Sequence, residues 1–293
     1  MHTTVDAFLK TAWADHGDHP QEVAERLSTS TGLIHARAEF APYVRLLTHV
    51  YGEHLGRWQH AVELLDRLRA LPSYDGSPEV ARPIDLAVAT MRFAAGDAAA
   101  LNELSVDSRV SALATAASAF AARDELQKAI AAYERALQSA AGGLPADSPA
   151  VRALAVGGNN LAAVLERRVD RDATHTLAML AAAEAGLKYW KQSGTWLEEE
   201  RAEYRLARSQ LQAGKAPDAV ASAQRCIAVC RRNGAPAFEL FFGFAVLALA
   251  QHGAGDRAAS EANRAEAMRQ LELVPDEERR WCSDDLAELG TMP

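Results

Sequence analysis

The chain has 293 residues, enough for one or two domains with a substantial core. Hydrophobic residues make up 49% of it and charged residues 24%, with 11 prolines and 18 glycines, which excludes a disordered, collagen-like or disulfide-stapled chain. The formal net charge of -8 disfavours non-specific binding to nucleic acid or to an anionic membrane.

The apolar residues and cysteines predict a cytoplasmic protein. Residues 1–16 contain no long apolar stretch behind a basic start, so no secretory signal is expected. The longest apolar run, Leu240–Ala250, is shorter than the about 18 residues that a membrane span needs. The number of cysteines is odd (Cys226, Cys230 and Cys282), and without a secretory signal this indicates reduced thiols. Cys226 and Cys230 lie one helical turn apart, and we expect small buried side chains there rather than a metal or redox pair.

Apolar residues recur at helical spacing along nearly the whole chain and almost nowhere with the alternation of a strand. Glycine, proline and aspartate interrupt this pattern and delimit segments of helical length. The predicted helices are, in chain order, 4–15, 20–28, 36–54, 58–70, 80–94, 97–104, 108–122, 125–140, 149–167, 172–191, 196–212, 216–232, 236–252, 256–272 and 276–289. A chain of helices without strands forms a bundle or a solenoid.

Internal repetition favours the solenoid. Small residues recur in the first helix of successive helix pairs, at Ala117, Ala162, Ala207 and Ala248, with spacings of 45, 45 and 41 residues. A period of this length with two helices in each unit is typical of a helical-hairpin array. Each hairpin leaves an apolar face that only the next hairpin covers, so we predict one continuous all-α domain.

The hairpin between residues 108 and 140 carries the most complete pattern. Its turn at Asp124 is followed by Ala129, Tyr133 and Ala136, in the small–aromatic–small order of a tetratricopeptide repeat (TPR). The chain therefore resembles the TPR family over about residues 36–272.

The long period and the sequence Asn159-Asn160-Leu161-Ala162 are similar to the kinesin-light-chain type of repeat. This resemblance implies a right-handed superhelical solenoid of about five to six antiparallel hairpins. It also implies a scaffold or adaptor that binds a protein or peptide in its concave groove, without catalysis and without a cofactor.

We divide the chain into an N-terminal segment 1–35 (a degenerate repeat or cap), a repeat array 36–272 and a C-terminal capping helix 273–293. The last helix is acidic, and its polar outer face would keep the end of the array soluble. Trp281 and Leu286 are its predicted inward anchors. An acidic interaction tail is the alternative for this segment.

No enzyme motif is present: the sequence lacks a phosphate-binding loop, a dinucleotide fingerprint, a nucleophile elbow and a zinc-protease motif. The histidines form two groups along the chain, His16 with Asp18 and His19, and His49 with Glu53, His54 and His60. We interpret the first group as an ordinary helix start and the second as packed or solvated side chains, so no metal, no cofactor and no catalysis are expected. An enzyme would be favoured instead if the second group converged on a metal in a pocket.

Residues 21–34 resemble a helix-turn-helix in outline. In a DNA-binding protein the helix after Ser30 would enter the major groove, but only His35 and Arg37 would offer basic groups there. We therefore predict a degenerate hairpin or cap, with nucleic acid disfavoured as a partner. A transcriptional regulator or peptide sensor is the alternative function.

The most informative polar pattern lies in the helix predicted at 196–212. Arg201, Arg205 and Arg208 fall in one narrow stripe between two apolar faces, as in a helix packed on both sides. By the resemblance, this stripe would line the concave groove, with Asn160 one repeat earlier and Phe242 one repeat later.

These five residues form the predicted peptide-binding site. Asn160 would bond a peptide backbone, an arginine would hold a carboxylate in two bonds, and Phe242 would supply an apolar contact. The expected partner is a protein or peptide with an acidic or C-terminal carboxylate group. The alternative is that Glu198 and neighbouring acids pair with the arginines on a solvated surface. The identity of the partner and the oligomeric state are not predicted.

Overall fold

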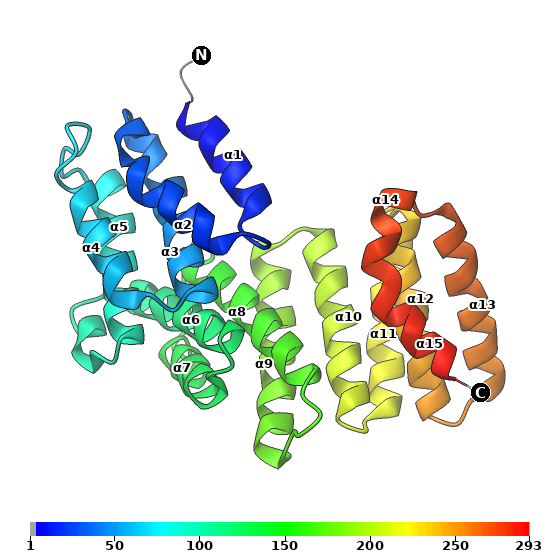
Figure 1. Cartoon of the computed structure of the whole chain (residues 1–293). Coiled ribbons are helices and arrows are strands. Elements are labelled where there is room, and N and C mark those ends of the chain that lie inside the picture. The colour runs from blue at the N-terminus through cyan, green and yellow to red at the C-terminus, as the bar shows by residue number, and fades with distance from the viewer. Residues whose placement is uncertain (1–3, 293) are drawn as a thin grey trace. The chain divides into compact units, whose positions relative to one another are not determined.

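The computed structural model describes residues 4–292, and every regular element in that range is a helix (Figure 1). The chain forms two compact units, one that ends at Leu144 (unit 1) and one that begins at Pro145 (unit 2). The expected all-α class is confirmed. The predicted domain boundaries at 35 and 272 stay predictions, and the division at Leu144 was not among them. Within residues 4–292 no helix combines the length and apolarity that crossing a bilayer requires.

Unit 1 contains seven α-helices and four short 3-10 or π-helical turns within its described residues. They are α1 (Val5–Asp15), α2 (Pro20–Thr29), η1 (Thr31–Leu33), η2 (Arg37–Glu39), α3 (Phe40–His49), η3 (Val50–His54), α4 (Trp58–Leu68), α5 (Pro78–Ala94), η4 (Ala98–Leu101), α6 (Val106–Ala122) and α7 (Leu126–Ser139). The turn η3 is π-helical and continues directly from α3. Helices α4 and α5, α5 and α6, and α6 and α7 pack as consecutive neighbours.

Unit 2 contains three long hairpins and a C-terminal segment that folds back on them. Its helices are α8 (Pro149–Glu166), α9 (Ala173–Ser193), α10 (Trp196–Gln212), α11 (Ala216–Arg232), α12 (Ala237–Gly253), α13 (Arg257–Leu273), α14 (Asp276–Arg279), η5 (Arg280–Cys282) and α15 (Ser283–Thr291). Helix α8 packs against α9, α10 against α11, and α12 against α13, and each hairpin packs against the next.

The small residues that revealed the repeat lie at the helix contacts. Ala117, Ala162, Ala207 and Ala248 are all fully buried. Their small side chains let neighbouring helices approach closely, as ridges-into-grooves packing at short interaxial distance requires. The turns agree with the prediction as well, because Asp124 between α6 and α7 has a φ of 60° and Gly214 between α10 and α11 has a φ of 72°. The hairpin array is therefore confirmed within each unit.

The two layers of unit 2 differ in how closely their helices approach one another. The first helices of the hairpins, α8, α10 and α12, contact one another more extensively than the second helices α9, α11 and α13 do. Because α8 and α12 both pack directly against α10, the three first helices form one layer, called the first-helix face below.

The C-terminal segment differs from the single helix predicted at 276–289. It breaks into α14, η5 and α15, and α15 lies across α12 (Figure 1). Trp281, a predicted anchor, is 63% exposed, so that prediction is wrong. Cys282 and Leu289 are buried instead, and Leu286 packs on the same core. The 3-10 turn at Arg280–Cys282 rotates the apolar face of the segment, which moves Trp281 outward.

The helix-turn-helix alternative is also wrong, because the recognition helix is absent. After α2 the chain forms the 3-10 turns η1 and η2, and the next α-helix begins only at Phe40. That helix directs Phe40, Tyr43 and Leu47 into the core of unit 1. Arg37, one of the two expected DNA contacts, pairs with Asp75 at 2.5 Å.

Candidate functional site

Helix α10 carries the predicted arginine stripe, and a capping box fixes its start. The Thr195 hydroxyl oxygen accepts a hydrogen bond from the amide of Leu197 at 3.3 Å, and the Glu198 carboxylate accepts one from the amide of Thr195 at 2.8 Å. These bonds satisfy amides that have no partner within a helix. Hydrogen bonds from Thr195 hold the pKa of Glu198 below its usual value. Glu198 therefore caps the helix, and within α10 it is Glu200 that lies near the arginine stripe, with its Oε1 3.8 Å from Arg201 Nε.

Arg208 holds the C-terminal helix on the first-helix face. Its two terminal nitrogens donate to the two carboxylate oxygens of Glu288, each at 2.6 Å, in the planar two-bond arrangement that arginine favours. Tyr204 Oη donates to Asp285 Oδ1 at 2.8 Å one turn earlier. Both acids belong to α15, so two side chains of α10 bind the acidic face of that helix.

The other two arginines pair with acids of the neighbouring first helices. Arg201 Nη2 donates to Glu239 Oε1 of α12 at 2.5 Å, and Arg205 donates to Glu166 at the end of α8. Ser209 Oγ donates to the second oxygen of Glu166 at 2.6 Å. Each arginine of the stripe thus contacts a carboxylate from a different helix, and these carboxylates occupy the positions where a ligand carboxylate was expected.

The arginines of the stripe differ in how far their side chains are buried. The Arg208 side chain is only 12% exposed, whereas Arg201 is 55% exposed. Burial is the largest influence and lowers the pKa of Arg208, but the hydrogen bond to Glu288 together with the charge interactions with Tyr204, Asp285 and Glu288 leaves the pKa above its usual value. Burial raises the pKa of Asp285, which Arg208 and Tyr204 oppose. Arg208 is therefore a permanent buried cation with two acidic partners, and Arg201 remains accessible from solvent.

Phe242 of α12 lies beside the stripe, and its role in ligand binding stays a prediction. Its ring packs edge-on against Tyr204, with centroids 5.6 Å apart. The guanidinium of Arg205 lies 5.9 Å from the centroid of the same tyrosine ring. Tyr204 thus joins Phe242, Arg205 and, through Asp285, helix α15. Helical spacing alone places Tyr204 on one of the two apolar faces beside the stripe.

Asn160 occupies the first-helix layer on α8, apart from this group. Its side chain is half-buried. Within residues 4–292 it makes no hydrogen bond to another protein group, and none joins it to the arginines. Gly186 of α9 brings the two helices together next to this position, because a Cβ there would lie 3.2 Å from the amide nitrogen of Asn159. The role of Asn160 in ligand binding stays a prediction.

The two buried acids of α10 were not predicted from the sequence. Glu200 and Glu203 are each only 1% exposed, although charged residues at a helix start are usually solvated. Glu203 accepts from Lys191 Nζ and Arg225 Nε, both at 3.0 Å. Both acids lie on the side of α10 that faces α11, which only the hairpin packing reveals.

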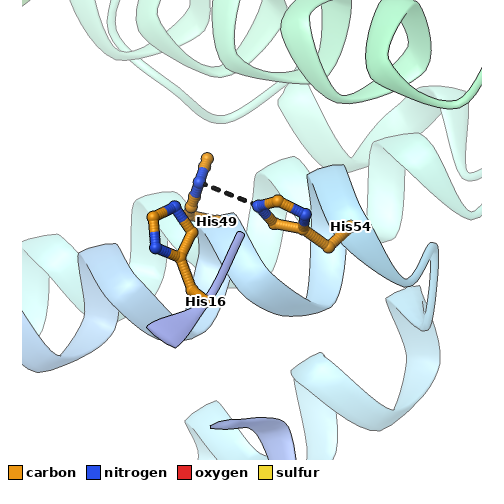
Figure 2. Close-up of side chains that lie close together, drawn as sticks. All are labelled: His16, His49 and His54. Carbon is orange, nitrogen blue, oxygen red and sulfur yellow. Dashed lines mark hydrogen bonds between the residues drawn. The ribbon is translucent and has the colours of Figure 1, made fainter. Parts of the chain in front are cut away.

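Two sets of metal-ligating side chains converge within the described residues. In unit 2 they are Glu200, Cys226 and Cys230, all buried; in unit 1 they are His16, His49 and His54, all half-buried (Figure 2). The second set combines members of the two histidine groups along the sequence, whereas Asp18, His19 and His60 are not part of it. Burial, followed by the neighbouring imidazoles of His49 and His16, lowers the pKa of His54.

No protein-family model and no curated protein matches the chain. Two solved structures, both of a Podosopora anserina protein described as a kinesin light chain with nearly identical TPR-like repeats, are similar to it. One is 17% identical with a TM-score of 0.49, covering 78% of this chain and 92% of that chain. The other, a substituted form, is 15% identical with a TM-score of 0.48, covering 87% and 96%. The likeness to these structures is one of helix arrangement. The hairpins of this chain pack through buried small residues and turn at residues with positive φ, and this makes the fold a TPR-like helical repeat.

Proposed function

We propose that this chain is a non-catalytic scaffold whose first-helix face in unit 2 binds an acidic helical segment of a partner protein. Helical-hairpin repeats generally mediate contacts between proteins, and they do so with extended concave surfaces. The observation that carries the proposal is the chain's own acidic helix α15, seated on α10 through Tyr204 and Arg208.

Helix α15 indicates the chemistry of the partner. It presents two acids, Asp285 and Glu288, to one tyrosine and one arginine, while Leu289 of the same helix is buried in the core of unit 2. An acidic face beside an apolar anchor is what an amphipathic helix offers to a groove. A partner segment with this pattern would use the same contacts and would compete with α15.

The rest of the stripe can extend such an interaction. Arg201 is half-exposed even while paired with Glu239, and the half-buried side chain of Asn160 makes no hydrogen bond to another group of residues 4–292. A ligand longer than α15 would exchange Glu239 for its own carboxylate at Arg201 and bond its backbone to Asn160. This arrangement explains why the stripe continues beyond the two residues that hold α15.

The test measures binding of a fluorescently labelled peptide that copies residues 275–292 to the full chain by fluorescence anisotropy. Wild type is compared with a released variant, Glu288→Gln combined with Leu289→Ala, which loses the ion pair and the buried anchor of α15. We expect the released variant to bind the peptide at least about 10-fold more tightly, because the competing helix is weakened; one charge-assisted contact alone corresponds to about 1.5–3 kcal/mol.

Arg208→Gln in the released variant should reduce peptide binding about 10-fold or more. Arg232→Gln, an exposed arginine of α11, is the matched control and should leave binding unchanged. A peptide of the same composition in scrambled order tests whether net charge alone is recognised. Equal binding by the Arg208→Gln and Arg232→Gln variants, or equal binding of the scrambled peptide, would refute the proposal. Circular dichroism establishes that all variants are folded.

A further inference from the structure

Three imidazole side chains from two different helices meet at one point in unit 1 (Figure 2). His16 is the C-cap of α1, His49 ends α3, and His54 ends the π-helical turn η3. One ring nitrogen of each lies within 4.8 Å of the corresponding nitrogens of the other two. The three rings are 4.9–5.1 Å apart between centroids.

The π-helical turn is what brings His49 and His54 together. In an α-helix two residues five positions apart point about 140° away from each other. Here the amide of Leu55 donates to the carbonyl of Val50 at 3.1 Å, a bond across five residues instead of four. The wider turn places residues five apart on the same side, and the His49 and His54 Nε2 atoms are 3.2 Å apart. Such turns are rare in helices and are frequent at functional sites.

An accepting oxygen on the outer side of two of the rings favours the tautomer that carries its proton on Nδ1. His16 Nδ1 lies 2.6 Å from the carbonyl oxygen of Trp13, and His49 Nδ1 lies 3.2 Å from Oε1 of Glu53. A carbonyl or carboxylate oxygen only accepts, so Nδ1 of each ring is the donor and Nε2 keeps its lone pair. A carbonyl or carboxylate behind each imidazole is the arrangement that orients histidines bound to metal ions.

The spacing and the donor set fit a transition-metal ion. With zinc–nitrogen bonds of about 2.0–2.1 Å, two ligands of a tetrahedral site are about 3.3–3.4 Å apart, close to the observed His49–His54 spacing of 3.2 Å. The His16 ring nitrogen lies within 4.8 Å of the other two, and a bound ion would draw it closer. Three neutral imidazoles without a thiolate suit zinc, copper or nickel and not calcium or magnesium, which require oxygen ligands.

We propose that His16, His49 and His54 form a binding site for one divalent transition-metal ion, zinc above the others, with the fourth coordination position open to water or to an external ligand. The ion replaces the proton that His54 Nε2 shares with His49, and His54 then carries its proton on Nδ1. The side chain of His49 is 24% exposed, so solvent reaches the site. Bound metal would also fasten α1 to α3 and η3, because its ligands come from both sides.

Zinc binding to the untagged full chain, freed of metal by a chelator, provides the test. Competition with a chromogenic zinc indicator should give one tight site per chain in wild type. His16→Ala and His49→Ala should each abolish that stoichiometric binding, and the exposed His35→Ala should leave it intact. Glu53→Gln keeps all three imidazoles and should weaken binding about 10- to 100-fold, since the glutamate orients His49.

Two further readouts distinguish a built site from adventitious binding. Cobalt(II) in place of zinc should give the visible absorption of a four-coordinate ion in wild type and not in the His16→Ala variant. Zinc should raise the Tm of wild type and leave that of the same variant unchanged, because only a folded-state site stabilises the fold. Absence of tight zinc binding in wild type, or equal stoichiometry in wild type and the two histidine variants, overturns the proposal. Circular dichroism of metal-free variants excludes loss of folding as the cause.

Discussion

Glu200 gives unit 2 a stability that depends on pH in a direction unusual for a glutamate. Its Oε2 accepts from the thiols of Cys226 and Cys230, both at 3.4 Å, in the contact between α10 and α11. Burial, followed by a hydrogen bond with Glu239, raises the pKa of Glu200 from 4.5 to about 10. At neutral pH the buried group is therefore the neutral acid, which donates to Glu239. Arg201 donates to both oxygens of the same Glu239 carboxylate.

The magnitude follows from proton linkage. Between pH 4.5 and about 10 the folded state binds one more proton than the unfolded state, so the free energy of unfolding falls as the pH rises. The slope is about 1.36 kcal/mol for each pH unit. From about pH 5.5 to about pH 7.5 the contribution of Glu200 should fall by about 2.7 kcal/mol. The slope requires only that the folded pKa stay above the upper pH.

Glu200→Gln removes this dependence while preserving shape and hydrogen bonds, because the amide also donates to Glu239 and accepts from the thiols. Urea unfolding followed by circular dichroism at the two pH values should show the variant gaining about 2.7 kcal/mol on wild type as the pH rises. Glu184→Gln, on the exposed face of α9, controls for the substitution itself. A stability difference between Glu200→Gln and wild type that is the same at both pH values would refute the reasoning.

The remaining predictions concern packing and buried hydrogen bonds. Gly186→Val should lower the free energy of unfolding by about 2–3 kcal/mol, because its Cβ would press on the backbone of α8. Ala181→Val, on the exposed face of α9, is the control and should lower it by about 0.5 kcal/mol or less. Similar losses for both variants in urea titrations would contradict the close approach of α8 and α9. Tyr51→Phe should cost about 1–2 kcal/mol, since it leaves the buried carbonyl of Ala24 without its 2.9 Å donor. Tyr74→Phe removes only a half-buried 3.4 Å contact, and an equal loss in Tm for both variants would argue against that view of the Tyr51 bond.

The helices and their pairing could be predicted because their signals are local. The spacing of apolar residues fixes which segments bury one face, and α10 begins and ends where the pattern predicted. The recurrence of Ala162, Ala207 and Ala248 revealed the hairpins, since close contact between helices tolerates only small side chains. Asp124 and Gly214 marked the turns because few residues adopt positive φ at low cost.

The errors arose where distant residues decide the environment. The exposed Trp281 resulted from a 3-10 turn that helical spacing does not reveal. The segment after Ser30 failed to form a helix because Phe40 and Tyr43 begin the next one by packing into the core. Burial of Glu200 depends on α11 and α12 and has no marker within α10 itself.

By itself the sequence determined an all-helical repeat of hairpins and the face of α10 on which three arginines lie, because helical periodicity is set within a few residues. Only the tertiary structure decided which carboxylates those arginines meet, Glu239, Glu166 and Glu288, each 38 or more residues away. Only the tertiary structure brings His16 close to His49 as well, because His16 lies 33 positions earlier in the chain and yet has a ring nitrogen within 4.8 Å of one of His49. Charge pairing and metal ligation depend on distances of a few ångströms between side chains, and across helices those distances are fixed by packing.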